Sequence, residues 1–385
     1  GVWGFARVLR LEHPSWRVLT VDAAADQFVS DTFCKGAMRG FATETDLQVS
    51  WKGGLRFVSQ LTQASGAIKT EHVHNAGVYL VTGGLGGLGL RAAQLLADTG
   101  AGSCVLTSRS GRIQREGQQL EARLNALCAS TKILTLACDV SDPYEVDALL
   151  KILAGESLQG ALHAAGILQD RLLRLMPAAE MRSVFAPKAS SGSLLHLGTK
   201  ARPMRTLLYF SSVSSTFGNV GQGNYSAANA YLDAISTRLR VDGCVVSSVQ
   251  LPTVAGVGMG QATIDTAIAT VAKEQLRFSV SLEAYVEVLQ CMMNPTLSAM
   301  RSVQAPLPHA MQMALQTHTA SADVTETKQT SALEKVIVSL AESMRQPHME
   351  SLVMRVVREV TGDEQVASGT PLMEAGVDSL AATEL

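Results

Sequence analysis

The chain of 385 residues is 46% hydrophobic and 17% charged, a composition that suits roughly two or three globular domains of about 150 residues each. Its net charge is −2 and no run of Lys or Arg stands out, which argues against nucleic acid and membrane surfaces as partners. The six cysteines are scattered without a CxxC pair, so we expect reduced thiols, no metal site and a cytoplasmic location.

The first segment, residues 1–70, combines a predicted helix at Val2–Leu11 with a predicted strand at Trp16–Val21 and a second apolar run at Leu55–Val58. It holds no phosphate-binding loop and no cluster of titratable side chains, so its expected role is structural. The chain opens without Met and stops inside a helical pattern, which we interpret as a piece of a longer protein.

Residues 77–298 alternate short apolar runs with helical patterns. The runs are continuously apolar, as expected for parallel strands that are buried on both faces. One helical pattern, Leu90–Ala97, is closed by Gly100, a residue type that commonly ends helices. This order predicts an α/β fold, a doubly wound Rossmann-type parallel sheet with ligands at the carboxyl ends of its strands. The predicted strands are Val78–Thr82, Cys104–Ser108, Ile133–Cys138, Ala161–Ala164, Leu207–Ser211 and Val245–Leu251.

Two further segments follow the predicted sheet. Residues 299–346 are rich in Ala, Ser, Thr and Gln, which predicts a linker with one helix near Leu333–Met344. Amphipathic patterning returns in residues 347–385.

A glycine-rich turn directly follows the first strand of the large segment and precedes a helix. Its GxGxxG spacing allows a pyrophosphate to approach the backbone at a helix N-terminus. The alternative is a glycine-rich turn without a ligand, and the flanking strand and helix favour the nucleotide site. The cofactor residues predicted in this turn are Thr82, Gly84, Leu85, Gly86, Leu88 and Gly89.

The choice between nicotinamide cofactors depends on the end of the second strand, where NAD-specific sites carry an Asp or Glu. Ser108 and Arg109 stand there instead, and an Arg can pair with the 2′-phosphate of NADPH. Arg109 could otherwise be a solvated loop charge. Asp139 and Val140 follow the third strand, and Asp139 suits either the adenine amino group or a cap on the next turn.

Reduction of a ketone needs a proton donor for the developing alkoxide and a group that polarises the carbonyl. Ser212 follows the fifth strand and Tyr225 opens the next helix, so both are expected to face one crevice. Asn229 lies one helical turn after Tyr225, on the same helix face. Taken singly, Ser212 could cap a helix and Tyr225 could be a packed aromatic residue.

These residues resemble the short-chain dehydrogenase/reductase superfamily, specifically the ketoreductase domains of type I polyketide synthases and animal-type fatty acid synthases. Asn229 stands where the superfamily usually has Lys, and megasynthase ketoreductases carry that Lys upstream, as Lys188 does here. The resemblance implies that Tyr225 protonates the alcohol oxygen and Ser212 hydrogen-bonds the ketone. It further implies that Lys188 lowers the pKa of Tyr225 and contacts the nicotinamide ribose, while Asn229 orders a proton relay. Alone, Lys188 could be a surface charge.

The resemblance also implies further cofactor contacts at the ends of later strands, with His163 in a structural role. The residues concerned are Ala164, Ala165, Gly166, Ser211 and Pro252.

Asp170 ends Leu168–Asp170, at a place where B-type ketoreductases, which form D-configured alcohols, often carry Leu-Asp-Asp. The Trp that marks A-type enzymes is replaced by Phe217. The resemblance therefore favours a B-type enzyme with Asp170 in stereocontrol. Leu251–Val254 departs from the Trp-Gly-x-Trp that often precedes the substrate lid, and the family pattern resumes at Gly258.

The two ends extend the resemblance. Residues 1–70 resemble the structural subdomain of such ketoreductases, a truncated Rossmann-like unit that is incomplete at its N-terminus here. Thr370–Leu380 resembles the start of an acyl carrier protein domain, which implies phosphopantetheine on Ser379. The alternative is an amphipathic helix with Ser379 as its N-cap.

The expected function is NADPH-dependent reduction of a β-ketoacyl thioester, tethered to an acyl carrier protein, to the β-hydroxyacyl thioester. The other domains of a homodimeric polyketide synthase would be its partners. Two alternatives remain open: the same step in a type I fatty acid synthase, and a catalytically silent nucleotide-binding scaffold.

Overall fold

The computed structural model describes residues 1–23, 47–52, 55–59, 76–114, 117–202, 204–260, 279–293, 302–304 and 358. The predicted helix at Leu333–Met344 and Ser379 lie outside the described residues. The same is true of the predicted linker and carrier segments, apart from residues 302–304 and 358.

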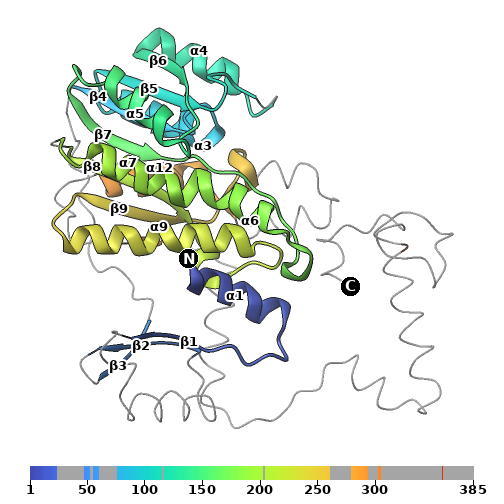
Figure 1. Cartoon of the computed structure of the whole chain (residues 1–385). Coiled ribbons are helices and arrows are strands. Elements are labelled where there is room, and N and C mark those ends of the chain that lie inside the picture. The colour runs from blue at the N-terminus through green and yellow to red at the C-terminus, as the bar shows by residue number, and fades with distance from the viewer. Residues whose placement is uncertain are drawn as a thin grey trace, which may run out of the picture.

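A seven-stranded sheet forms the centre of the molecule, and all its neighbouring strands are parallel. The strand order is β12-β9-β8-β7-β4-β5-β6 (Figure 1). The chain therefore winds outward from β4 in one direction and from β7 in the other, which places a crevice at the carboxyl ends of these two strands. The strands are β4 (Val78–Thr82), β5 (Ser103–Ser108), β6 (Lys132–Ala137), β7 (Leu158–His163), β8 (Thr206–Ser212), β9 (Val246–Leu251) and β12 (Ser302–Gln304).

The predicted α/β sheet is confirmed, with small shifts at strand ends. β4 coincides with its predicted range and is buried at every position. β7 begins earlier than predicted because Gly160, which resembles a turn residue in the sequence, lies inside the strand. A Cβ there would lie 2.7 Å from Cγ2 of Thr206 on β8, so the close packing of these strands requires glycine. β12 falls within the segment that the sequence assigns to a linker.

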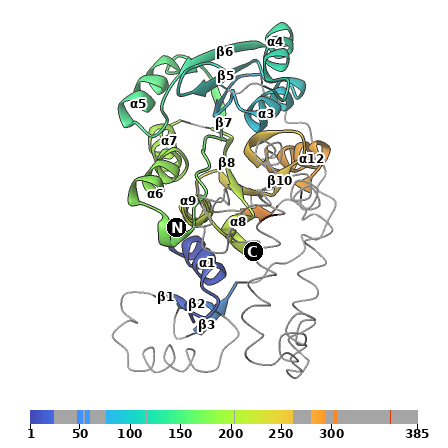
Figure 2. The same cartoon turned by 90° about the vertical axis from the view of Figure 1, so that its right-hand side faces the viewer.

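Helices cover both faces of the sheet (Figure 2). On one face α3 (Gly87–Asp98), α4 (Leu120–Ser130) and α12 (Leu282–Met293) bury a core that includes Leu106 and Phe210. On the other face a second core includes Leu80 and Leu207. The helices of that face are α5 (Pro143–Ile152), α6 (Ala178–Phe185), α7 (Ser191–Thr199) and α9 (Gly223–Val241). Short elements complete the described fold: η1 (Leu173–Leu175), η2 (Ala186–Ser190), α8 (Ser214–Phe217), β10 (Thr253–Val254) and β11 (Ser279–Val280).

The predicted end of α3 at Gly100 is confirmed. Gly100 has a φ of +96°, its N–H donates to the carbonyl of Ala97, and the N–H of Ala101 donates to Leu96. This pattern satisfies carbonyls that the helix end would otherwise leave unpaired. The chain can then turn back into β5.

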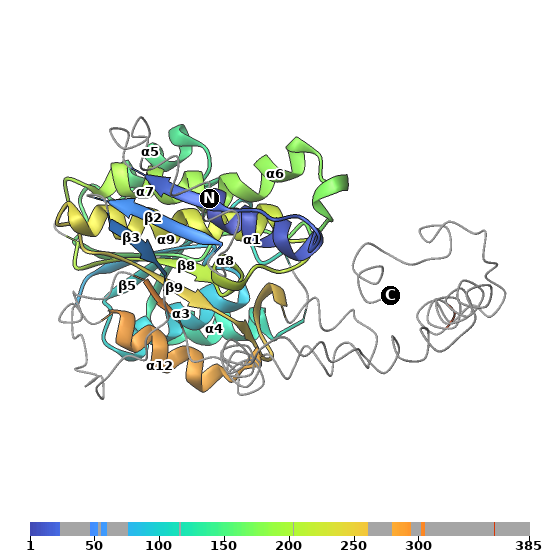
Figure 3. The same cartoon turned by 90° about the horizontal axis from the view of Figure 1, so that it is seen from below.

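The N-terminal segment forms α1 (Val2–Glu12), which lies beside α9 (Figure 3), and a small sheet in the order β1-β2-β3 (Figure 2). Its strands are β1 (Thr20–Ala23), β2 (Gln48–Lys52) and β3 (Leu55–Val58). The predicted strand at Trp16–Val21 is wrong at its start, because the Trp16 ring stacks on His13 at 4.2 Å within a turn. The strand proper begins only at Thr20.

Helix α1 packs closely on α9 of the large domain. A Cβ at Gly4 would lie 2.2 Å from the carbonyl oxygen of Ser226 and 2.8 Å from Cβ of Ala230, so glycine permits this approach. Arg7 donates to Oε1 of Gln48 at 2.6 and 3.1 Å and to the carbonyl of Ser215. The segment is therefore joined both to its own sheet and to the large domain. Among the described residues, no helix is long and apolar enough to cross a membrane.

Candidate active site

The glycine-rich turn between β4 and α3 is built from close backbone contacts. Gly83 has a φ of +66°, and the N–H of Gly84 donates to the carbonyl of Thr107 at 3.0 Å. A Cβ at Gly89 would lie 2.3 Å from the carbonyl oxygen of Gly83. The turn leaves the first N–H groups of α3 at the mouth of the crevice, an arrangement that suits a phosphate group.

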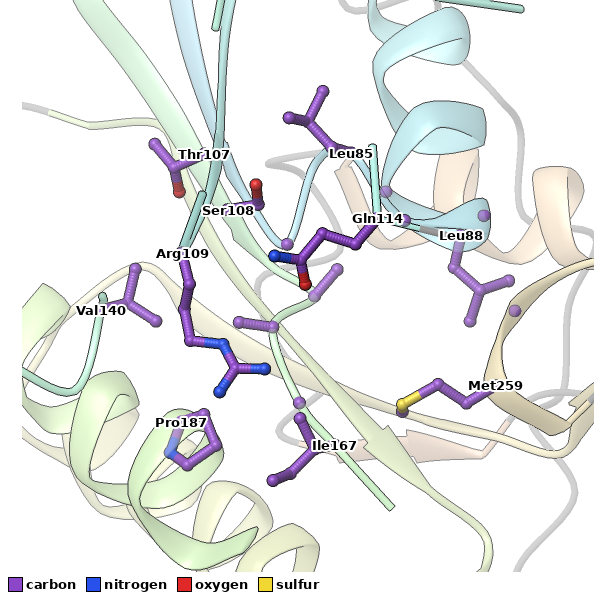
Figure 4. Close-up of a pocket in the computed structure, with 18 of the residues that line it drawn as sticks. Leu85, Leu88, Thr107, Ser108, Arg109, Gln114, Val140, Ile167, Pro187 and Met259 are labelled. Atoms are coloured by element: carbon purple, nitrogen blue, oxygen red, sulfur yellow. The ribbon is translucent and has the colours of Figure 1, made fainter. Parts of the chain in front are cut away.

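A pocket lies beside this turn, at the carboxyl ends of β4, β5, β6 and β7 (Figure 4). It is lined by most of the residues that the sequence predicts for the cofactor. These are Leu85, Gly86, Leu88, Gly89, Ser108, Arg109, Asp139, Val140, Ala164, Ala165 and Gly166. The glycine-rich turn and the guanidinium groups of Arg109 and Arg112 in the lining suit a dinucleotide, whose phosphate groups are anionic.

Four predicted cofactor residues do not line this pocket: Thr82, Gly84, Ser211 and Pro252. Thr82 is fully buried and its hydroxyl is bonded to a ring nitrogen of His163. Ser211 is buried and donates to the carbonyl of Asn229 at 3.3 Å. Gly84 shapes the turn through its bond to Thr107, and Pro252 is buried after β9. All four are buried, and their role as cofactor contacts stays a prediction.

Other residues that were not predicted from the sequence also line the pocket: Gly83, Gly87, Thr107, Arg112, Gln114, Gln118, Leu120, Cys138, Ile167, Pro187, Gly258 and Met259. Gln118 and Gly258 exchange two hydrogen bonds, Nε2 to the carbonyl at 3.1 Å and N–H to Oε1 at 2.9 Å. They are far apart in the chain, so no local pattern could pair them. Arg112 could have been found, since it shares the loop of Arg109.

Arg109 follows β5 and extends across the pocket towards Pro187 (Figure 4). Arg112 lines the same pocket, and its carbonyl accepts a hydrogen bond from Ser108 at 3.3 Å. Asp139 is the one acidic residue among the described residues of the lining. Its Oδ1 accepts from the N–H and hydroxyl of Ser141, at 2.9 and 2.6 Å. Asp139 therefore caps the turn, one of its two predicted roles, while also lining the pocket.

His163 holds the end of β4 against the backbone around Lys188. Its Nδ1 is 2.7 Å from the hydroxyl of Thr82, and its Nε2 is 2.9 Å from the carbonyl of Lys188 and 3.0 Å from the hydroxyl of Ser191. Burial lowers the pKa of His163 to about 4. The imidazole is thus neutral at physiological pH, which agrees with the structural role predicted from the sequence.

We expect His163 to make the folded protein acid-sensitive. Between its ordinary pKa of 6.5 and about 4, the unfolded chain binds a proton that the folded chain does not, so stability falls as the pH is lowered through this window. The loss is about 3 kcal/mol at pH 4 and below. Urea unfolding at pH 7 and pH 5 should show a smaller pH dependence for His163→Asn than for the wild type. An equal dependence in both proteins would contradict this assignment.

The four predicted catalytic residues come from different elements and meet at the crevice. Ser212 ends β8, Tyr225 and Asn229 lie on the first turns of α9, and Lys188 lies in η2. The Lys188 Nζ is 5.3 Å from the centre of the Tyr225 ring. Asn229 Nδ2 donates to the carbonyl of Tyr225 at 2.9 Å. Among the described residues, its buried Oδ1 has no hydrogen-bond partner.

Lys188 is buried, with only 3% of its surface exposed, so it is not a surface charge. η2 is a π-helix, a rare turn that often marks functional sites. The Nζ of Lys188 donates to the carbonyl of Phe210 at 2.7 Å, and a Cβ at Gly166 would lie 2.8 Å from the Cε of Lys188. Burial lowers the pKa of Lys188 to about 8, against the opposing effect of Asp233.

Burial raises the pKa of Tyr225 to about 12, and the charge of Asp170 adds to this effect. Hydrogen bonds with the side chains of Asn229 and Ser212 lower the pKa of Tyr225 in part. This differs from the expectation that Lys188 lowers it, since the Nζ points to the Phe210 carbonyl. The phenol therefore keeps its proton at neutral pH and can donate it.

Asp170 lies near enough to Tyr225 for its charge to raise the pKa of the phenol. Its Oδ2 accepts from Nε2 of Gln222 at 2.9 Å, and its buried Oδ1 has no partner among the described residues. Burial raises the pKa of Asp170, opposed by the Gln222 bond. Phe217 ends α8, and in the segment without tryptophans Val254 is buried in the core.

The large domain is similar to a known protein family and to parts of several curated proteins. Residues 77–256 match the family model described as the KR domain. The erythronolide synthase EryA3 of Saccharopolyspora erythraea is 36% identical over 267 residues, which are 69% of this chain and 8% of that protein. The pikromycin synthase component PikAIII of Streptomyces venezuelae is 30% identical over 428 residues, which cover 100% of this chain and 26% of that protein. The chain thus spans a small part of these curated relatives.

Solved structures agree. One described as A-type ketoreductases from a modular polyketide synthase has a TM-score of 0.69 and 27% identity, covering 85% of this chain and 67% of that one. A C2-type ketoreductase from a modular polyketide synthase has a TM-score of 0.62 and 27% identity, covering 83% and 67%. The same fold therefore occurs in ketoreductases of different types.

Proposed function

We propose that this chain reduces a β-ketoacyl thioester to the β-hydroxyacyl thioester, because residues 77–256 match the KR domain model and the chain is similar to ketoreductases of modular polyketide synthases. The observation that carries the proposal is the meeting of Ser212, Tyr225, Lys188 and Asn229 beside a glycine-lined nucleotide pocket. A hydroxyl, a phenol and a buried cation at one point suit the addition of a proton to a developing alkoxide.

A ketone becomes an alcohol when its carbon gains a hydride and its oxygen gains a proton. When bound in the pocket, the reduced nicotinamide supplies the hydride. Ser212 holds the ketone oxygen by a hydrogen bond, and Tyr225 gives that oxygen its proton. In the resting structure the Nζ of Lys188 donates to the Phe210 carbonyl and lies 5.3 Å from the centre of the Tyr225 ring. As the proton leaves, Lys188 turns its ammonium towards the phenolate and stabilises it, because a cation near an anion lowers its free energy in a buried site. Asn229 orders the path by which solvent returns the proton to Tyr225.

The cofactor we propose is NADPH. β5 ends at Ser108 and is followed by Arg109, and no Asp or Glu stands at its end to hold a ribose 2′-hydroxyl. Arg109 and Arg112 both line this end of the pocket, so two guanidinium groups are available for a 2′-phosphate.

Replacing Arg109 by Ala is expected to raise the KM for NADPH roughly 10- to 100-fold, since a hydrogen bond to a charged group contributes about 1.5–3 kcal/mol. The KM for NADH should change little, because NADH has no 2′-phosphate. Steady-state kinetics with both cofactors measures the ratio. Lys132→Ala is the matched control: it removes an exposed cation at the start of the neighbouring strand β6, outside the pocket, and should leave both values unchanged. Equal losses with NADPH and NADH would contradict the role of Arg109.

The product we propose is the D-configured alcohol of a B-type enzyme. The support is Asp170, which accepts a hydrogen bond from Gln222 and acts electrostatically on Tyr225, together with Phe217 in place of the A-type Trp. Chiral chromatography of the reduced product tests this directly. Mainly L-alcohol would overturn the stereochemical assignment while leaving the reduction itself intact.

The substrate we propose is carried by an acyl carrier protein within a longer polyketide synthase, and the parent protein is a homodimer. Residues 1–70 then act as the structural subdomain and 77–298, with strand β12, as the catalytic one. The rest of 299–346 is the linker, and Ser379 of a partial carrier domain at 347–385 carries phosphopantetheine. The similarity to polyketide synthases favours this setting over a fatty acid synthase.

The proposal is tested by mixing the protein with NADPH and a β-ketoacyl N-acetylcysteamine thioester and following NADPH oxidation. We expect turnover and a β-hydroxyacyl product. A folded protein that binds NADPH without turnover would instead be a silent nucleotide-binding scaffold.

A further inference from the structure

Glu12 is the last residue of α1, and its carboxylate joins two loops of the large domain. Its Oε2 accepts from the N–H of Leu173 at 2.6 Å, and its Oε1 accepts from the N–H of Gly221 at 3.0 Å. Both oxygens of one side chain are thus used by backbone groups that belong to different loops. Such charge-assisted bonds are among the stronger hydrogen bonds of proteins.

The first loop follows β7 and carries Asp170, and the second precedes α9 and Tyr225. They also contact each other directly. The N–H of Arg171 donates to the carbonyl of Gly221 at 2.7 Å, and Nε2 of Gln222 donates to Asp170 at 2.9 Å. The position of Asp170 relative to Tyr225 therefore depends on how these two loops are held together.

The loops fit tightly at their second contact. A Cβ at Gly223 would lie 2.2 Å from Cδ2 of Leu173, and Nδ2 of Asn224 donates to the carbonyl of Gln169 at 2.8 Å. Gly221, with a φ of +79°, allows the turn that presents its N–H to Glu12. A small displacement of either loop would alter the wall that faces Tyr225.

We propose that Glu12, from the N-terminal segment, is a positioning residue that sets the substrate side of the active site by holding the Leu173 and Gly221 loops in register. This rests on the proposed function, since it concerns the reaction at Tyr225. The two loops lie outside the pocket lining, which ends at Ile167 on this side and includes no residue of 169–173 or 219–225. Glu12 should therefore act on the acyl substrate and not on cofactor binding.

The variant that tests this is Glu12→Gln, which keeps the size of the side chain but turns one of its two acceptors into a donor. We expect kcat/KM for a β-ketoacyl N-acetylcysteamine thioester to fall about tenfold or more, because misplacement of reacting groups is costly. The minor alcohol isomer should increase in the same assay. The Kd for NADPH, measured by fluorescence, should stay within about twofold of the wild-type value. Glu12→Asp, whose carboxylate is one methylene shorter, serves if Glu12→Gln does not fold.

Arg10→Gln is the matched control on the same helix. Arg10 donates to the carbonyls of Val18 and Leu47, at 2.7 and 2.8 Å, and so joins α1 to its own small sheet without contacting either loop. It should lower stability while leaving kcat/KM and the isomer ratio unchanged. If Arg10→Gln loses as much activity as Glu12→Gln, α1 acts only as a general support and the proposal is wrong.

Hydrogen exchange followed by mass spectrometry supplies a readout that does not depend on activity. Peptides that contain Leu173 and Gly221 should exchange faster in Glu12→Gln than in the wild type, because each N–H depends on the carboxylate for its acceptor. Unchanged exchange would overturn the proposed contact. If the wild type shows protected amides but no reduction, the proposed function fails while the contact stands. Wild-type catalysis in Glu12→Gln would overturn the positioning role alone.

Discussion

Replacing Tyr225 by Phe is expected to lower kcat for the β-ketoacyl thioester by roughly 10²- to 10⁴-fold, the range that a positioned general acid contributes. The ring remains and only the hydroxyl is lost, so the packing of α9 should persist. Because the pKa of Tyr225 is raised to about 12, the phenol is protonated throughout the neutral range and no other described group replaces it at this position. The Kd for NADPH should be unchanged.

Tyr231→Phe is the matched control for this variant. Tyr231 lies on the same helix, and its hydroxyl is 2.9 Å from that of Ser193 on α7. Removing it costs one hydrogen bond of about 1 kcal/mol in stability, with no effect expected on kcat. Full activity in Tyr225→Phe, or an equal loss in Tyr231→Phe, would show that Tyr225 is not the proton donor.

Replacing Lys188 by Met is expected to change activity and stability in opposite directions. The activity should fall by about 10²-fold or more, because the buried cation that stabilises the Tyr225 phenolate is lost. The stability at pH 7 should stay equal or rise by about 1–2 kcal/mol, since the unfavourable burial of the charge exceeds the lost bond to the Phe210 carbonyl. Steady-state kinetics and urea unfolding measure the two effects.

The pH dependence of stability distinguishes the removal of the buried Lys188 charge from a simple change in packing. The pKa of Lys188 is lowered from 10.5 to about 8 in the folded chain. Between these values the unfolded chain binds the additional proton, so wild-type stability should gain from Lys188 as the pH rises from 8 to 10.5. Lys188→Met should lack this gain. Lys151→Met, which removes an exposed cation paired with Asp147 on α5, should behave as the wild type.

Much of the fold could be predicted because the central parallel strands are almost entirely buried. A continuous apolar run such as that of β4 can therefore be recognised as a buried strand from its own residues alone. Strand β6, at the edge of the sheet, is largely exposed. The proposed catalytic residues could be placed near one another for a related reason. Ser212 ends a strand and Tyr225 begins the helix that follows it. Because parallel strands end at the same edge of the sheet, both residues can be placed there from the sequence alone.

Contacts between distant segments could not be predicted. The Gln118 and Gly258 pair and the two bonds of Glu12 depend on how separate parts of the chain dock, and no local pattern records that. The strand predicted from Trp16 failed similarly, because the stacking of Trp16 on His13 outweighs the strand propensity of the apolar run. The pKa of Tyr225 depends on burial and on the direction of the Lys188 side chain, neither of which is visible in a sequence.

We propose that hydride passes from NADPH to a β-ketoacyl thioester in this domain and that Tyr225 supplies the proton. The most direct test is a single reaction with NADPH that carries deuterium at the transferred position, analysed by mass spectrometry. We expect the wild type to yield a β-hydroxyacyl thioester with one deuterium on the carbinol carbon, and Tyr225→Phe to yield almost none in the same time. Recovery of unreduced thioester from a wild-type protein that binds NADPH would contradict this proposal.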